Sequence, residues 1–169
     1  MPDVAQRSAW ERALRDPALQ DLPYKIETNE YDQLVLSPHQ LYHSRWQGRI
    51  QDALREHASS RGEQPPEFPI QTSKGVKLPD VVWVSTERLQ EIPTDATASP
   101  VAPEICIEVL SEGNTDAEID EKRKLYVDAG AEEVWTCDET GRMTFYDADG
   151  VLERSNLVPA FPVQIGDDH

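Results

Sequence analysis

Two carboxylate residues stand in stretches of this sequence that otherwise have the composition of buried β-strands. Asp80 follows a proline at the start of the apolar stretch 80–85, and Glu108 lies within the apolar stretch 105–110. A charge inside an apolar strand is costly unless a cation, a metal ion or a proton neutralises it. Two such carboxylates that lie close together would form a metal-binding cage.

A lysine on the next predicted helix completes this set. The segment 116–129 has the periodicity of a helix, and Lys122 falls within the apolar arc that includes Tyr126. The neighbouring Arg123 and Lys124 fall outside that arc. Lys122 is therefore predicted to point toward the sheet that carries the two acids. Aspartate, glutamate and lysine side chains that converge in this way are typical of nuclease chemistry.

The order of these residues resembles that of a known family. The motifs that carry the resemblance are Pro79-Asp80, Glu108-Val-Leu-Ser111, Lys122-x-x-x-Tyr126, Gly130 and Glu133-Val-Trp135. They are similar to those of the Uma-two family of restriction-endonuclease-like proteins, in the PD-(D/E)XK nuclease superfamily. The resemblance covers residues 24–165 and also includes His43 and Asn156-Leu-Val-Pro159.

One position departs from the superfamily pattern. Leu110 stands two residues after the glutamate, where the superfamily has a lysine. In the Uma-two family that lysine is regarded as displaced to the helix, and Lys122 occupies the matching position. The resemblance therefore gives Lys122 the role of the displaced lysine.

The resemblance implies both a fold and a reaction. The fold would be α/β, with a restriction-endonuclease-like central mixed sheet flanked by helices and additional hairpins. The reaction would be hydrolysis of DNA phosphodiester bonds with Mg²⁺ or Mn²⁺, a hard cation that prefers oxygen ligands. Asp80, Glu108 and the backbone carbonyl of Val109 would bind the metal, and Lys122 would orient the attacking water or stabilise the transition state. His43 would be a further catalytic residue, because the family has a histidine there.

Each of these residues also has a purely structural explanation. Asp80 could cap a turn, and Lys122 could form a buried ion pair with Glu108. His43 lies within the apolar arc of the helix predicted over 38–58, where a histidine is commonly a hydrogen-bonded core residue. Two further acids are candidates for an additional metal ligand: Glu27 and Glu30.

Several predicted elements must position these side chains. In chain order they are a helix over 4–15, a hairpin of strands 24–27 and 34–36, a helix over 38–58 with Ser37 as N-cap and Pro38 at its first position, and strands 68–72, 80–85 and 105–110. These are followed by a helix over 116–129 capped by Asn114 or Thr115, a strand over 132–137 and a hairpin of 142–146 and 151–154. The connection 86–103 is predicted to be a long loop beside the site.

Length and composition describe an ordinary globular chain. The 169 residues are predicted to form a single domain over 1–169, with 1–22 as a peripheral N-terminal arm. Because no apolar run of about 18 residues could span a bilayer and the N-terminus lacks a signal-peptide core, we expect a cytoplasmic protein with no membrane partner. Cys106 and Cys137 both lie in predicted strands, and we expect free, buried thiols.

The net charge of −16 limits the function classes. Nucleic-acid-binding proteins usually have basic surfaces, so this charge argues against tight, non-specific DNA binding. It favours the alternative function, a non-catalytic protein-binding module, homodimeric, that retains the nuclease fold. An RNA nuclease would use the same site residues. If the protein cleaves DNA, its basic residues should gather around the site, and the candidates are Arg45, Arg49, Lys74, Lys77, Arg123 and Lys124.

Overall fold

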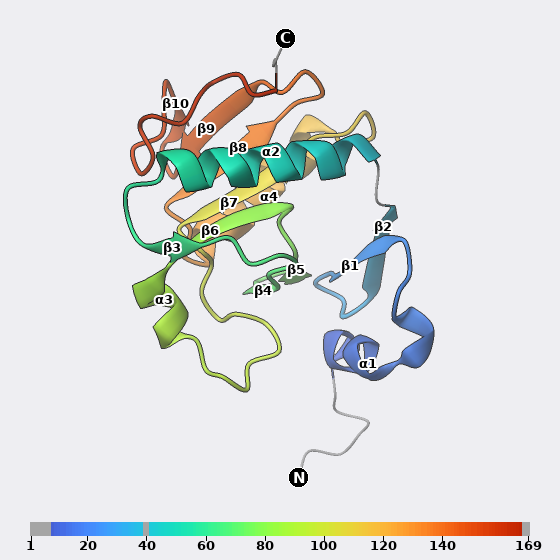
Figure 1. The fold of residues 1–169 in the computed structure, drawn as a ribbon. Helices are drawn as coiled ribbons and strands as arrows, with labels where there is room; N and C mark the ends of the chain where they lie inside the picture. The colour runs from blue at the N-terminus through green and yellow to red at the C-terminus, as the bar shows by residue number, and fades with distance from the viewer. Residues whose placement is uncertain (1–7, 39–40, 167–169) are drawn as a thin grey trace.

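A mixed six-stranded sheet forms the centre of the molecule (Figure 1). The computed structural model describes residues 8–38 and 41–166, with the backbone alone for 41–43. The central elements are β3 (Gly62–Glu63), β6 (Val81–Ser85), β7 (Ile105–Val109), β8 (Glu133–Cys137), β9 (Met143–Asp147), β10 (Gly150–Leu152) and helices α2 (Leu41–His57) and α4 (Asp116–Asp128). The strand order is β10-β9-β8-β7-β6-β3, with β7 and β8 parallel and the other neighbours antiparallel. This arrangement confirms the predicted α/β fold with a mixed sheet.

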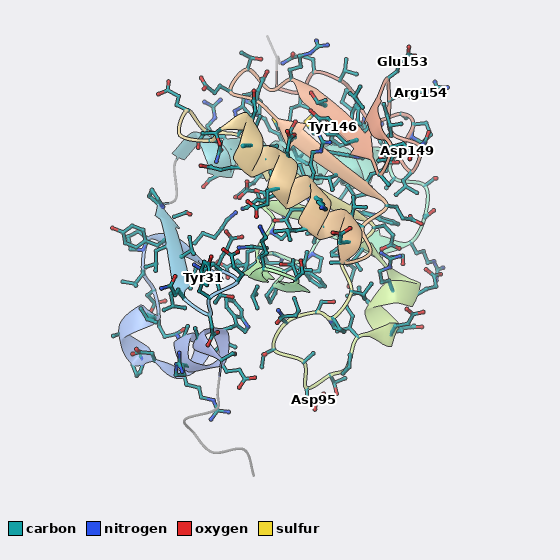
Figure 2. The ribbon with its side chains drawn as sticks, turned by 180° about the vertical axis from the view of Figure 1, so that it is seen from behind. Tyr31, Asp95, Tyr146, Asp149, Glu153 and Arg154 are labelled. Atoms are coloured by element: carbon teal, nitrogen blue, oxygen red, sulfur yellow. The ribbon has the colours of Figure 1, made fainter. Side chains whose placement is uncertain are left out.

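The helices α2 and α4 cover opposite faces of the sheet. Figure 1 shows α2 in front of the strands, and the reverse view in Figure 2 shows α4 in front of them. Side chains alternate along β7, because successive residues of a strand point to opposite faces. Ile107 accordingly packs in one cluster with Ile50 of α2, and Cys106 packs in another with Tyr126 of α4. Each face of β7 therefore meets a different helix.

Two hairpins pack against each other beside the central sheet. They are formed by β1 (Tyr24–Thr28) with β2 (Leu34–Pro38), and by β4 (Ile70–Thr72) with β5 (Gly75–Lys77). The Thr28 hydroxyl accepts a hydrogen bond from the Val76 N–H at 2.8 Å, and the Thr28 carbonyl accepts one from Lys77 Nζ at 2.7 Å. Gly75 has a φ of +93°, and a Cβ there would lie 2.6 Å from the Thr28 carbonyl oxygen. This close approach fixes β1 beside β5.

The N-terminal segment also packs on these hairpins. Helix α1 (Ala9–Arg15) is followed by the short 3₁₀ helix η2 (Pro17–Leu19). Trp10 is buried in a cluster with Val76 and Leu78, and its indole N–H donates to the Thr97 carbonyl at 3.1 Å. Within the described ranges, no helix is both long enough and apolar enough to cross a membrane.

Two local predictions are wrong. Ser37 and Pro38 were expected to begin a helix, but both belong to β2, where Pro38 pairs with Tyr24. The hairpin extends two residues further than its apolar pattern indicates, because pairing with β1 outweighs the local capping signal. The loop predicted over 86–103 contains helix α3 (Thr86–Glu91), which the Ser85 hydroxyl caps by accepting from the Arg88 N–H at 3.1 Å.

Other local predictions are confirmed. Thr115 caps α4, since its hydroxyl accepts a hydrogen bond from the Glu118 N–H at 3.2 Å. Cys106 and Cys137 are buried and free.

A buried carboxylate holds the C-terminal segment against the sheet. Glu133 accepts hydrogen bonds from the Trp135 indole N–H at 2.8 Å and the Ser155 hydroxyl at 2.7 Å. It also accepts from the backbone N–H groups of Asn156 at 2.9 Å and Leu157 at 3.0 Å. These four donors are uncharged, and together they satisfy a carboxylate that is almost entirely buried.

Candidate active site

The two predicted acids lie on the same face of the sheet. Val82 of β6 pairs with Cys106 of β7. Asp80 lies two residues before Val82, and Glu108 lies two residues after Cys106, so strand alternation places both acids on the face that α4 covers. The sequence patterns therefore bring together the carboxylates predicted to cooperate.

Asp80 joins the start of β6 to the end of β7. Its side chain is 4% exposed. Its Oδ2 accepts a hydrogen bond from the Val109 N–H at 2.7 Å, and its Oδ1 lies 3.4 Å from Gln47 Nε2 of α2. The residue thus has a structural role in addition to its predicted chemical role.

Glu108 is held by two residues of α4. The Tyr126 hydroxyl donates to its Oε1 at 2.6 Å, and Lys122 Nζ lies 3.5 Å from the same oxygen. Lys122 and Tyr126 are four residues apart and share one helical face. Asp80, Glu108 and Lys122 therefore converge from three different elements, as their spacing predicts.

A second lysine, which the sequence analysis missed, lies between the two acids. Lys25 of β1 places its Nζ 2.8 Å from Asp80 Oδ1 and 3.8 Å from Glu108 Oε2. Its side chain is 16% exposed. The sequence holds a weak signal for this contact, because Lys25 and Glu27 alternate onto one face of a short strand.

Glu27 also reaches the site, but through Lys122. Its Oε1 lies 3.3 Å from Lys122 Nζ, and its Oε2 accepts a hydrogen bond from the Leu78 N–H at 2.7 Å. The other candidate ligand, Glu30, is exposed after the end of β1. The cluster thus contains three carboxylates and two ammonium groups, which sum to −3 + 2 = −1.

Burial and the neighbouring charges shift the pKa values within this cluster. Burial and the charge of Glu108 raise the pKa of Asp80, although Lys25 opposes the shift. Burial alone would raise the pKa of Glu108, but Lys122 and Lys25 together bring it well below its ordinary value. Burial lowers the pKa of each lysine, yet the nearby carboxylates outweigh it and raise both pKa values. Glu108 is therefore ionised at neutral pH, and both lysines are protonated.

The cluster opens to two adjoining clefts. One has a volume of about 350 Å³ and is lined by Glu27, Glu108, Val109 and Lys122 among others. The second has a volume of about 620 Å³ and runs along α2 past Asp21 and Glu67. Four residues line both clefts: Lys25, Ser44, Gln47 and Asp80. Solvent or a ligand can therefore approach Asp80 from two sides and Glu108 from the first cleft.

The donor set limits how a metal ion could bind here. In the part of the chain that the structure describes, no three His, Cys, Asp or Glu side chains form a group that could hold a metal ion. Asp80 and Glu108 alone would then supply side-chain ligands. Both are hard oxygen donors of the kind that Mg²⁺ and Mn²⁺ prefer. The ammonium group of Lys25 marks a place where one cation contacts both carboxylates, so the pair fits such an ion.

The remaining predicted residues contribute less. His43 lies in α2, but its side chain is outside the described residues. None of the six basic residues predicted to gather at the site lines either cleft. Lys74 instead pairs with Glu121, and the Arg123 guanidinium lies 3.9 Å from the centre of the Tyr146 ring, which Figure 2 labels. These two side chains therefore contact other residues and do not line the clefts.

Comparisons with known proteins show what this chain is similar to. Residues 16–159 match the Uma2 family, which is described as "Putative restriction endonuclease". The fold is similar to that of a crystal structure titled "a putative nuclease belonging to DUF820" from Anabaena variabilis ATCC 29413. The TM-score is 0.64 at 16% sequence identity, and the match covers 82% of this chain and 78% of that chain. No curated protein matches the chain in sequence. At this identity, the structural match shows a shared fold.

Proposed function

The chain belongs to the Uma2 family of restriction-endonuclease-like proteins, as its motifs predict, and from this membership we propose that it hydrolyses DNA phosphodiester bonds with Mg²⁺ or Mn²⁺. The observation that carries the proposal is the convergence of Asp80, Glu108 and Lys122 on the wall of one cleft, which a second cleft adjoins at Asp80. A fold alone does not determine a reaction, so the proposal depends on these side chains.

Three groups would hold the metal ion. One oxygen of Asp80 accepts from the Val109 N–H, and one oxygen of Glu108 accepts from the Tyr126 hydroxyl. The second oxygen of each carboxylate takes part in neither of these hydrogen bonds. In an extended strand the N–H and C=O of one residue point to the same side. The Val109 N–H faces Asp80, so its carbonyl oxygen is the natural third ligand.

Lys122 would act as an electrostatic group. A bound metal ion would lower the pKa of a water molecule and neutralise charge on the cleaved phosphate. Lys122 is protonated because Glu108 and Glu27 raise its pKa. It can therefore donate a hydrogen bond to the attacking water or to a phosphate oxygen, but it cannot take a proton from the water. Its role is to orient the water and stabilise negative charge.

A second candidate function is supported by Lys25. Because its ammonium group contacts both acids, the site is nearly balanced in charge when no metal ion is bound. A module that uses the fold only to bind protein, as a homodimer for example, would be stable in this state. The net charge of −16 also suits such a module better than it suits a DNA-binding protein.

A nicking assay distinguishes the two functions. Supercoiled DNA should be nicked at low ionic strength with Mg²⁺ or Mn²⁺, and EDTA should stop the reaction. Glu108→Gln should reduce the rate by about 100-fold or more, since the variant loses a charged group at the reacting centre. Glu104→Gln is the matched control, because Glu104 is also a buried acid beside β7 but pairs with Arg88 outside the clefts.

The substrates decide what a negative result means. Cleavage of RNA but not of DNA would support the proposed site residues and would assign RNA as the substrate. An absence of cleavage of supercoiled, duplex and single-stranded DNA and of RNA, at all salt concentrations, would favour the protein-binding module.

A further inference from the structure

We propose that Lys25 is an internal cation that occupies the metal position in the metal-free protein and must leave before a divalent ion can bind. The inference rests on the proposed function, since it assigns the same two carboxylates as metal ligands. It adds a residue from β1 that acts on metal binding rather than on the reaction itself.

The assignment of individual oxygens supports this competition. Asp80 Oδ2 is engaged by the Val109 N–H, and Glu108 Oε1 is engaged by Tyr126 and Lys122. The two remaining oxygens, Asp80 Oδ1 and Glu108 Oε2, are the ones that Lys25 Nζ contacts, at 2.8 Å and 3.8 Å. Asp80 Oδ1 also accepts a longer hydrogen bond of 3.4 Å from the neutral amide of Gln47. The two remaining oxygens are also the ones that a metal ion would use. The ammonium group and the ion therefore require the same place.

Both cations cannot share this place. Mg²⁺ binds its oxygen ligands at about 2.0–2.1 Å and keeps several waters, which leaves no room for an ammonium group in contact with the same oxygens. Two positive centres about 4 Å apart in a buried site also repel strongly. Lys25 must therefore move away from Asp80 and Glu108 when the ion arrives.

The fold allows the side chain of Lys25 to move while the backbone of β1 stays in place. The β1 backbone is fixed by the hydrogen bonds that join Thr28 to Val76 and Lys77. Lys25 also lines the cleft of about 620 Å³, whose lining residues include Asp21 and Glu67. A rotation of the flexible side chain would carry its charge into this cleft, toward solvent and two acids.

Metal affinities measured by isothermal titration with Mn²⁺ test the competition. Lys25→Met should bind Mn²⁺ about tenfold or more tightly than the wild type, because a cation in direct contact with the ligand oxygens is removed. Lys122→Met is the matched control. It removes the same charge, but from beside the Glu108 oxygen that Tyr126 already holds. A smaller gain in Lys122→Met than in Lys25→Met supports the proposal, whereas equal gains in both, or no gain in Lys25→Met, overturn it.

A measurement on the wild type covers the case in which Lys25→Met does not fold. The NMR signals of the lysine ammonium groups should be followed during titration with diamagnetic Mg²⁺. The signal of Lys25 should shift and exchange faster with water as its contacts with the acids are lost. Saturation with Mg²⁺ that leaves the Lys25 signal unchanged would overturn the proposal.

The outcomes separate this inference from the proposed function. Cleavage that depends on Glu108, together with equal Mn²⁺ affinity of wild type and Lys25→Met, would retain the nuclease and reject the role of Lys25. Tighter Mn²⁺ binding by Lys25→Met without cleavage of any substrate would retain the role of Lys25 and reject the nuclease. Failure of wild type and Lys25→Met alike to bind Mn²⁺ would reject both.

Discussion

At the scale of single residues, the hydroxyl of Tyr126 is the shortest contact of Glu108, at 2.6 Å. A hydrogen bond from a neutral donor to a buried charge contributes more than an ordinary one. The tyrosine also lies one helical turn from Lys122, so it helps to fix the carboxylate that the lysine faces. Its removal should weaken both the fold and the geometry of the site.

The variant Tyr126→Phe should therefore lower the free energy of unfolding by about 1.5–3 kcal/mol. Urea denaturation would measure the change. Tyr146→Phe is the control, because that half-buried ring contacts Arg123 through its face, and a change within about 0.5 kcal/mol is expected. Equal losses of unfolding free energy in the two variants would show that the hydrogen bond to Glu108 does not contribute more to stability than the contact of Tyr146.

The lowered pKa of Glu108 predicts how stability depends on pH. Its folded-state pKa of about 2 lies below the unfolded value, which is about 4.3. Its ionised form therefore stabilises the protein above the unfolded pKa, and this contribution is lost as the pH falls through that window toward the folded pKa. The raised pKa of Asp80 acts in the opposite direction, and the charge of Glu108 contributes to that shift, so the comparison must measure the net effect of removing the Glu108 charge.

Denaturation of wild type and Glu108→Gln in EDTA, from pH 7 downward, provides that comparison. The stability difference between them should be constant near neutrality and shrink as the pH falls below about 4.3. A difference that stays constant down to the acid limit would contradict the assignment of the low pKa to Glu108.

At the scale of elements, the position of Lys25 depends on how the first hairpin docks. Gly75 makes this docking possible, because its φ of +93° and its contact with Thr28 exclude a side chain. Gly75→Ala should cost about 1–3 kcal/mol in unfolding free energy, since it adds both backbone strain and a clash. It should also loosen β1 and thereby Lys25.

Urea denaturation and Mn²⁺ titration of Gly75→Ala would measure the two effects. Gly113→Ala is the matched control, because nothing lies within 4 Å of the Cβ it would add and its φ is not in the left-handed region. We expect Gly113→Ala to unfold like the wild type. A loss of stability in Gly75→Ala no larger than in the control would contradict a tight junction between the hairpins.

The elements also show what the sequence could and could not predict. The meeting of Glu108 with Lys122 was predictable, because strand alternation and helical periodicity each fix the direction of a side chain relative to its own element. Lys25 was not, since its contacts depend on how a separate hairpin is docked through Thr28. The extension of β2 through Pro38 was missed for the same reason, because pairing with β1 is a tertiary effect that a local capping signal does not include.

At the scale of the whole molecule, the net charge of −16 opposes the approach of DNA. Within the described residues, the only basic side chains that line the two clefts are Lys25 and Lys122. Few phosphates can therefore be neutralised on binding. The affinity for DNA should be low, and it should fall as salt rises, because salt weakens the contacts of Lys25 and Lys122 with phosphates.

Cleavage of plasmid DNA should accordingly fall by about tenfold or more when salt is raised from about 50 to 200 mM. A small phosphodiester such as bis(p-nitrophenyl) phosphate is the control. Its single charge makes few contacts, so its hydrolysis should change much less. An equal response of both substrates would indicate that salt acts on metal binding or on the fold.

Glu133 and Glu108 are two solutions to the problem of keeping an ionisable acid inside a protein. Glu133 has uncharged donors that belong to the fold, and three of them, from Ser155, Asn156 and Leu157, hold the C-terminal segment against β8. Glu108 is balanced mainly by ammonium groups at the ends of long side chains, and in the proposed exchange a metal ion replaces one of these cations while the sheet stays intact. The kind of partner, more than the depth of burial, thus distinguishes an acid with a purely structural role from an acid whose counter-ion can be replaced by another cation.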